Sequence, residues 1–177
     1  MGGDLVSIGS PGLTARINPL GAELWSLTDG DAREYMTDAD PAFWSGHAPI
    51  LFPIVGSLNG DTLRHNGAEY ALPRHGFTRR SEFEVIGQGA DHATFRLQDS
   101  AETRAVYPFA FVLDLSYRIA GMTLEVCASV TNPGGEALPF SLGYHPAFAW
   151  PLPGGADKHA HRVTFAQDEP QDVRRVA

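Results

Sequence analysis

Alternation of apolar and polar residues is the dominant pattern along this chain. From Phe111 to Ile119 an apolar residue occupies every second position, and residues 124–130 repeat the alternation after Ala120-Gly121. Successive side chains of a β-strand point to opposite faces of a sheet, so this spacing predicts two antiparallel strands, each with one buried face. The Ala-Gly pair between them predicts a tight hairpin turn.

Three further hairpins are predicted by the same combination of alternation and turn residues. Asn-Gly at residues 66–67 is a favoured pair for a two-residue turn, Pro-Leu-Gly occupies residues 19–21, and a glycine-rich loop spans residues 87–92. Strands are expected at residues 13–18, 22–27, 62–65, 68–72, 82–86 and 94–97. Many short strands separated by turn signals predict an all-β fold, an antiparallel β-sandwich or barrel.

Helical pattern is scarce, and the end of the chain departs from the strand pattern. Residues 40–44 and 100–106 each predict one short helical turn. Residues 162–165 are expected to begin a strand without a return partner, which would leave a sheet edge exposed. Residues 1–177 are therefore interpreted as a single domain that is incomplete at its C-terminus.

Length and charge narrow the class of protein further. The 177 residues suffice for one domain with a substantial core, and the net charge of −8 argues against nucleic acid or an anionic membrane surface as the main partner. The sequence has no apolar signal segment at its start and no apolar run of the about 20 residues that span a membrane, so a cytoplasmic protein is expected. Cys127 lies within a predicted strand and is expected to be a buried thiol.

Two histidine-bearing segments are the main candidates for chemistry. His75 lies between Arg74 and Gly76, with Arg79 shortly after it. Histidine titrates near neutral pH and can act as an acid or a hydrogen-bond donor, while an arginine can present a planar fork to hydroxyls or a phosphate. The simpler alternative is a loop histidine that is bonded to the backbone.

The second segment carries His145 among aromatic residues. Tyr144 precedes it, Phe148 follows, and flat apolar rings of this kind can cover the carbon face of a sugar. An aromatic core cluster with a structural histidine remains the alternative interpretation.

Other segments predict less specific chemistry. Leu51–Ser57 could form the bottom of a pocket, although a core strand is the simpler interpretation. His159 and His161 would share the face of a strand, but a metal site needs a third ligand, and none follows at a suitable spacing, so no metal site is expected. The chain has no phosphate-binding loop and no dinucleotide fingerprint, so no cofactor is expected. The histidines at residues 47, 65 and 92 are expected to be solvated.

Four segments together resemble the aldose 1-epimerase (galactose mutarotase-like) superfamily, and most closely its LacX-like branch. They are Asn-Pro-Leu-Gly-Ala-Glu-Leu at 18–24, Pro-Ile-Leu-Phe-Pro-Ile-Val-Gly at 49–56, Leu-Pro-Arg-His-Gly-Phe at 72–77 and Pro-Phe-Ser-Leu-Gly-Tyr-His-Pro-Ala-Phe at 139–148. The resemblance implies a large β-sandwich of the supersandwich type. It also implies a cofactor-free activity that interconverts the α and β anomers of a free aldose.

The resemblance also implies roles for individual residues. His145 would be the general acid that protonates the ring oxygen of the sugar, and His75 would bind and polarise the sugar close to that oxygen. The further residues expected to contact the sugar are Arg74, Arg79, Tyr144, Phe148 and Ser57.

Two departures from the family pattern matter. Ser57 stands where the family often has an arginine, and no glutamate of the chain lies in a segment that matches the family's late glutamate motif. That glutamate is the general base in the family, so the polypeptide is expected to be inactive or nearly so.

Two alternatives to an epimerase remain open at this point. A non-catalytic sugar-binding module would use the same rim of histidines and aromatic rings, and a metal-dependent cupin-like enzyme would bind a metal ion. The expected partner is a small sugar in the epimerase and sugar-binding interpretations. The identity of the sugar, its phosphorylation and the oligomeric state do not follow from the sequence.

Overall fold

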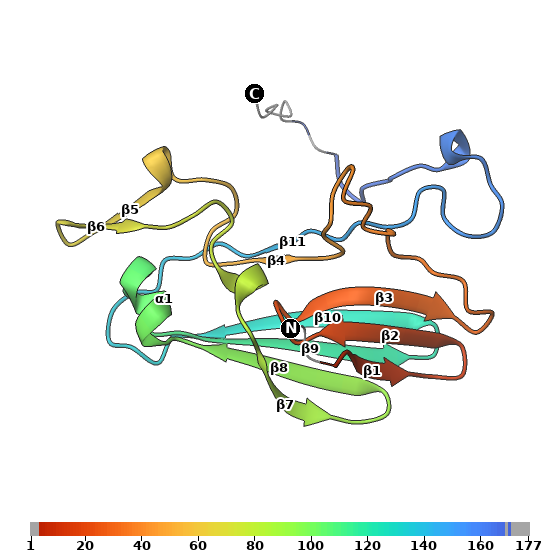
Figure 1. The fold of residues 1–177 in the computed structure, drawn as a ribbon, viewed down its shortest axis with the longest axis horizontal. Helices are drawn as coiled ribbons and strands as arrows, with labels where there is room; N and C mark the ends of the chain where they lie inside the picture. The colour runs from red at the N-terminus through yellow and green to blue at the C-terminus, as the bar shows by residue number, and fades with distance from the viewer. Residues whose placement is uncertain (1–3, 169, 171–177) are drawn as a thin grey trace.

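The computed structural model describes residues 4–168 and 170 and consists mainly of antiparallel β-strands. Two sheets face each other (Figure 1). The first contains β1 (Val6–Gly9), β2 (Leu13–Asn18) and β3 (Glu23–Asp29) in the order β1-β2-β3. The second has the order β10-β9-β8-β7 and contains β7 (Glu84–Gln88), β8 (His92–Gln98), β9 (Val112–Ala120) and β10 (Thr123–Thr131). This arrangement confirms the antiparallel β-sandwich expected from the alternation.

The smaller elements lie outside these two sheets. Strand β4 (Ile50–Leu51) pairs with β11 (Gly143–Tyr144), and β5 (Thr62–His65) pairs with β6 (Ala68–Ala71) in a hairpin that projects from the molecule (Figure 1). The remaining elements are the helix α1 (Ala101–Val106) and the 3-10 turns η1 (Asn59–Asp61), η2 (Thr78–Arg80) and η3 (Lys158–Ala160). The site described below is built from these short elements.

The core forms where β1 and β2 pack on β8 and β9. The alternating residues of β9 at positions 113, 115, 117 and 119 are all buried there, as the pattern predicted. Tyr117 also links the two sheets, because its hydroxyl donates a hydrogen bond of 2.5 Å to the carbonyl oxygen of Ala22. Burial raises the pKa of Tyr117, so the hydroxyl keeps its proton and remains a donor.

The predicted hairpins are confirmed, with shifts of up to two residues at strand ends. The turn at residues 66–67 joins β5 to β6, and α1 begins after Ser100, whose hydroxyl accepts a hydrogen bond from the backbone N–H of Thr103. At residues 40–44 the backbone N–H groups of Phe43 and Trp44 both donate to the carbonyl oxygen of Asp40, so this segment forms a single turn.

Three expectations about strands are wrong. Cys127 is exposed, because the residues of β10 that face inward are its neighbours at the alternating positions 124, 126, 128 and 130. Residues 162–165 form no strand within the described part of the chain. His159 lies in the turn η3 and His161 directly after it, so they do not share the face of a strand.

Candidate functional site

A short stretch at residues 50–52 brings the two predicted histidine segments together. On one side β4 pairs with β11, which ends one residue before His145. On the other side Phe52 forms a parallel bridge with Gly76, the residue that follows His75. Segments separated by about 70 residues in the sequence therefore flank the same piece of backbone.

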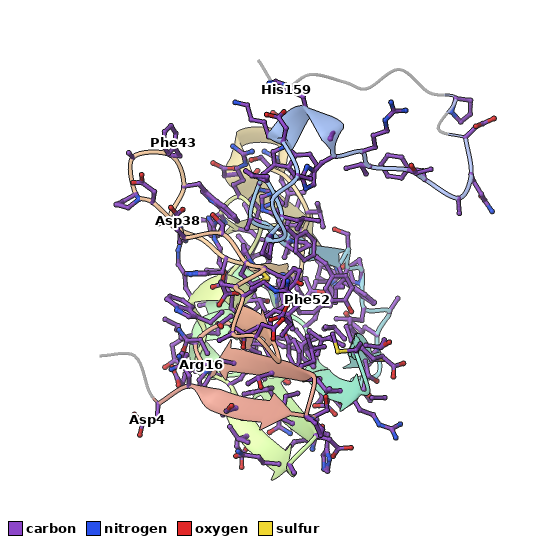
Figure 2. The ribbon with its side chains drawn as sticks, turned by 90° about the vertical axis from the view of Figure 1, so that its right-hand side faces the viewer. Asp4, Arg16, Asp38, Phe43, Phe52 and His159 are labelled. Carbon is purple, nitrogen blue, oxygen red and sulfur yellow. The ribbon has the colours of Figure 1, made fainter. Side chains whose placement is uncertain are left out.

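The carbonyl oxygen of Phe52 anchors the loop that carries His75. It accepts hydrogen bonds from the backbone N–H of Phe77 at 3.2 Å, from the backbone N–H of Thr78 at 3.4 Å and from the hydroxyl of Thr78 at 2.8 Å. Phe52 and Thr78 are fully buried, and Figure 2 shows Phe52 among densely packed side chains. A buried carbonyl oxygen must find its hydrogen-bond donors within the protein, so these bonds fix the position of the loop against residues 50–52.

Gly76 is required for this close approach. Its φ of +69° lies in the left-handed region, and a Cβ atom at this position would lie 2.2 Å from the carbonyl oxygen of Phe52. Both the backbone conformation and the available space therefore exclude a side chain here.

The tautomer of His75 follows from its hydrogen bonds. The backbone N–H of Gly56 donates to Nδ1 of His75 at 3.0 Å, and the backbone N–H of His75 donates back to the carbonyl oxygen of Gly56 at 2.8 Å. Nε of Arg74 faces the other ring nitrogen, Nε2, and a neutral imidazole has only one acceptor nitrogen. We assign Nδ1 as the acceptor, with the proton on Nε2, because the Gly56 N–H is held by the backbone and lies closer than the Arg74 guanidinium. Nε of Arg74 lies 3.2 Å from Nε2, but it is also a donor, so this contact is not a hydrogen bond in that tautomer.

The charge state of His75 follows from its surroundings. Burial lowers the pKa of His75, and the positive charges of Arg74 and Arg79, with His145, lower it further. At neutral pH the imidazole is therefore uncharged. Because Arg74 is exposed on a flexible stem and can move aside, Nε2–H is available as a hydrogen-bond donor to a ligand.

His145 is exposed and is positioned through its backbone. Its N–H donates to the carbonyl oxygen of Pro49 at 3.2 Å, and the N–H of Ala147 donates to the carbonyl oxygen of His47 at 2.8 Å. The imidazole lies edge-on to the indole of Trp44, with 5.0 Å between ring centroids. An exposed imidazole on a fixed backbone can exchange a proton with a bound molecule.

Glu23, at the start of β3, supports the segment that holds His145, and sequence reasoning missed this role. Its Oε1 accepts hydrogen bonds from the backbone N–H groups of His47 and Ala48, each at 2.8 Å. Both residues are buried, and His47 stacks on Trp25 with 3.9 Å between ring centroids. The expectation that His47 is solvated is therefore wrong, whereas His92 is exposed and His65 is half-buried.

The turn after β3 places the segment that holds Phe148. The Asp29 carboxylate accepts hydrogen bonds from the backbone N–H and the guanidinium of Arg33 and from the hydroxyl of Tyr35. Burial opposes ionisation of Asp29, but these hydrogen bonds outweigh it and lower its pKa to about 2. The ordered turn allows Met36 to form a bridge with Phe148.

Arg79 and Ser57 lie close to His75 in the structure. Ser57 is exposed and follows Gly56, the residue that bonds the imidazole. Arg79 belongs to η2, and its Nε is buried without a hydrogen-bond partner among the described residues. Burial lowers the pKa of Arg79, as do the neighbouring charges of Arg80 and Arg74, whereas Glu23 raises it.

A hollow of about 530 Å³ lies between the sheets and the His145 segment. Tyr144, His145 and Phe148 line it together with mainly apolar residues, and it does not include His75, Arg74, Arg79 or Ser57. The residues predicted to contact a sugar therefore form two groups, one in the hollow and one around His75. The residues that line the hollow are Leu13, Leu24, Leu27, Tyr35, Ala48, Ile50, Tyr117, Met122, Leu124, Val126, Tyr144, His145, Pro146 and Phe148.

No group of three or more histidine, cysteine, aspartate or glutamate side chains is arranged to hold a metal ion within residues 4–168. In the same part of the chain, no helix has the length and apolar character needed to cross a membrane.

Comparison with known proteins shows the family of this chain. The model of the aldose 1-epimerase family matches residues 4–175. The plasmid-encoded LacX protein of Lactococcus lactis subsp. lactis is 36% identical over 163 residues, which cover 89% of this chain and 54% of LacX. The chain thus spans about half the length of the curated relatives it matches.

Solved structures of similar proteins share the fold of this chain. A galactose mutarotase related enzyme from Lactobacillus acidophilus is 38% identical with a TM-score of 0.83, over 86% of this chain and 51% of that protein. A galactose mutarotase-like protein from Lactobacillus casei is also 38% identical, with a TM-score of 0.78 over 81% of this chain and 49% of that protein. The fold is therefore of the galactose mutarotase-like type.

Replacing Gly76 with alanine tests the close packing of the His75 loop against Phe52. We expect Gly76→Ala to lower the free energy of unfolding by at least about 3 kcal/mol, because it combines left-handed strain with overlap on a buried carbonyl. Gly121→Ala is the matched control, since its φ is +60° but no atom lies within 4 Å of the added Cβ. Urea unfolding measures both, and equal losses in the two variants would contradict the close approach.

The protonation of His75 gives a second test. We expect its imidazole, followed by nuclear magnetic resonance, to titrate below the ordinary midpoint of about 6.5. Arg74→Gln should raise the midpoint, whereas Arg80→Gln, at a residue that does not perturb His75, should leave it unchanged. Because the folded state binds this proton less readily than the unfolded chain, stability should fall as the pH drops below about 6.5. A midpoint above 6.5 would contradict the burial of this imidazole beside Arg74 and Arg79.

Proposed function

We propose, because the chain belongs to the aldose 1-epimerase family, that its two histidines take part in the interconversion of the α and β anomers of an aldose. The observation that supports this most directly is the pairing of both histidine segments with residues 50–52. An acid and a hydrogen-bond donor are thereby presented from opposite sides of one short stretch of backbone. The chain covers about half of its relatives, so the activity is proposed for the complete protein.

In the proposed reaction His145 is the general acid. Its imidazolium donates a proton to the ring oxygen while a base removes the proton of the anomeric hydroxyl, so the C1–O5 bond breaks and a neutral open-chain aldehyde forms. Rotation about the C1–C2 bond followed by closure onto the other face gives the second anomer. Matched proton transfers avoid a charged intermediate, and each contributes about 10²- to 10⁴-fold to the rate.

His75 supports this step without exchanging its own proton. Its lowered pKa and the acceptor role of Nδ1 keep Nε2–H as a neutral donor, which can bond to the ring oxygen or a neighbouring hydroxyl. We propose that Ser57 and Arg79 contact hydroxyls on the same side. Tyr144 and Phe148 are proposed to cover the apolar face of the ring from the rim of the hollow.

The general base is proposed to come from polypeptide that corresponds to the other half of the relatives. No glutamate of this chain matches the family's glutamate motif, and the buried Glu23 already uses one oxygen to hold two backbone N–H groups. The same polypeptide would cover the hollow, whose mainly apolar lining suits apolar side chains better than sugar hydroxyls. The 177-residue chain is therefore proposed to hold the acid but not the base.

Chemical rescue tests this division of roles. Optical rotation would follow the mutarotation of freshly dissolved α-glucose or α-galactose with the 177-residue chain, with and without added formate. We expect almost no acceleration from the chain alone and at least about tenfold acceleration by chain plus formate over formate alone, because the small carboxylate replaces the base. His145→Gln should abolish the effect.

His159→Gln is the matched control, because His159 is exposed and lies outside both histidine segments. Acceleration that persists in His145→Gln would show that His145 is not the acid. Saturable sugar binding without rescue by formate would instead favour a non-catalytic sugar-binding module on the same fold.

A further inference from the structure

The indole of Trp44 is the aromatic ring that lies against the imidazole of His145. The two ring centroids are 5.0 Å apart and the ring planes meet at 62°, which is an edge contact. Tyr144 and Phe148 are much closer to His145 in the sequence, but neither forms a ring contact with it in the described part of the chain. The aromatic neighbour of the proposed acid therefore comes from a different segment, residues 40–44.

Gly46 determines where this indole lies. A Cβ atom on Gly46 would be 2.5 Å from one carbon atom of the Trp44 indole and 2.9 Å from two others, so the ring rests directly against the glycine backbone. The backbone of the turn is fixed as well, because the carbonyl oxygen of Asp40 accepts the N–H groups of Phe43 and Trp44, each at 2.9 Å. Both the backbone and the packing thus give the indole a defined position.

Trp44 keeps an open surface in this position. Its residue is 37% exposed, and it is not among the residues that line the hollow. The next residue, Phe43, is 89% exposed and stands out from the molecule on a loop (Figure 2). A rigid aromatic ring that is already held in place offers a large contact area at a low cost in conformational entropy.

The other two candidate aromatic residues have a different environment. Tyr144 and Phe148 line the hollow, whose mainly apolar lining suits apolar side chains better than sugar hydroxyls. The open surface of Trp44 lies outside that lining, so it does not depend on what fills the hollow. Trp44 is therefore the aromatic residue that combines contact with His145 and access from solvent.

We propose that the exposed surface of the Trp44 indole binds the apolar C–H face of the aldose and holds the sugar beside His145. The face of an aromatic ring carries partial negative charge, which attracts the weakly positive C–H groups of a pyranose. A sugar bound there lies next to the imidazole, because the same indole contacts both. The inference rests on the proposed sugar site, but it concerns binding and holds whether or not the chain catalyses mutarotation.

Nuclear magnetic resonance titration of the 177-residue chain with glucose and with galactose tests the role of Trp44. We expect Trp44→Ala to raise the dissociation constant of at least one of these sugars about fivefold or more, because the stacking surface is lost. Trp44→Phe keeps a smaller aromatic face and should lose less affinity. Tyr144 and Phe148 are intact in both variants, so they cannot account for the difference.

Two further variants separate the position of the indole from its presence. Gly46→Ala leaves Trp44 in the chain but pushes the indole aside, and Gly46 has no positive φ that would add backbone strain. We expect it to move the imidazole signals of His145 in the free protein and to weaken sugar binding. Phe43→Ala removes a more exposed ring from the same turn and should leave the dissociation constants unchanged.

Four results would overturn the proposal. They are unchanged affinity in Trp44→Ala, equal losses in Trp44→Ala and Phe43→Ala, movement of the His145 signals in Gly46→Ala without weaker binding, and absence of saturable binding of either sugar. Failure of formate rescue alongside sugar binding that depends on Trp44 would instead count against the catalytic proposal alone.

Discussion

The buried carbonyl oxygen of Phe52 is the interaction on which the rest of this site depends. Three donors from the loop after His75 meet at this one acceptor, and Gly76 leaves the space that they need. The same short stretch pairs with β11 on its other side, next to His145. Because a buried carbonyl has no water to bond, displacing either loop would cost hydrogen bonds that nothing else replaces.

Electrostatics then decides what each histidine can do. Burial and then the charges of Arg74 and Arg79 lower the pKa of His75, so it is neutral at neutral pH, and the backbone N–H of Gly56 donates to its Nδ1. His145 is exposed, and its ring lies edge-on to Trp44. The two imidazoles therefore have different surroundings, and the proposed roles of one acid and one neutral donor rest on that difference.

Local chemistry explains what could be predicted from the sequence. The hairpin of β5 and β6 follows from Asn-Gly at residues 66–67, and the buried face of β9 follows from its period of two. The roles expected for the residues around His75 came from the family resemblance and stay predictions.

The rest depends on contacts distant in sequence. Burial of His47 arises from stacking on Trp25 and from the Glu23 carboxylate, 24 residues away, and no local pattern indicates either. Cys127, by contrast, was misplaced because burial was inferred from its residue type, although the alternation at residues 124–130 already puts it on the outer face of β10. Likewise, no local pattern indicates that Tyr144 and Phe148 line the hollow while His75 lies outside it.

The central claim is that His75 and His145 belong to one ligand site held by residues 50–52. The most direct measurement is a single nuclear magnetic resonance titration of the chain with glucose that follows the imidazole signals of both residues. Both signals should move with the same dissociation constant, while the signal of His92, an exposed residue on β8, stays in place. Movement of only one of the two signals, or movement with clearly different dissociation constants, would contradict a shared site.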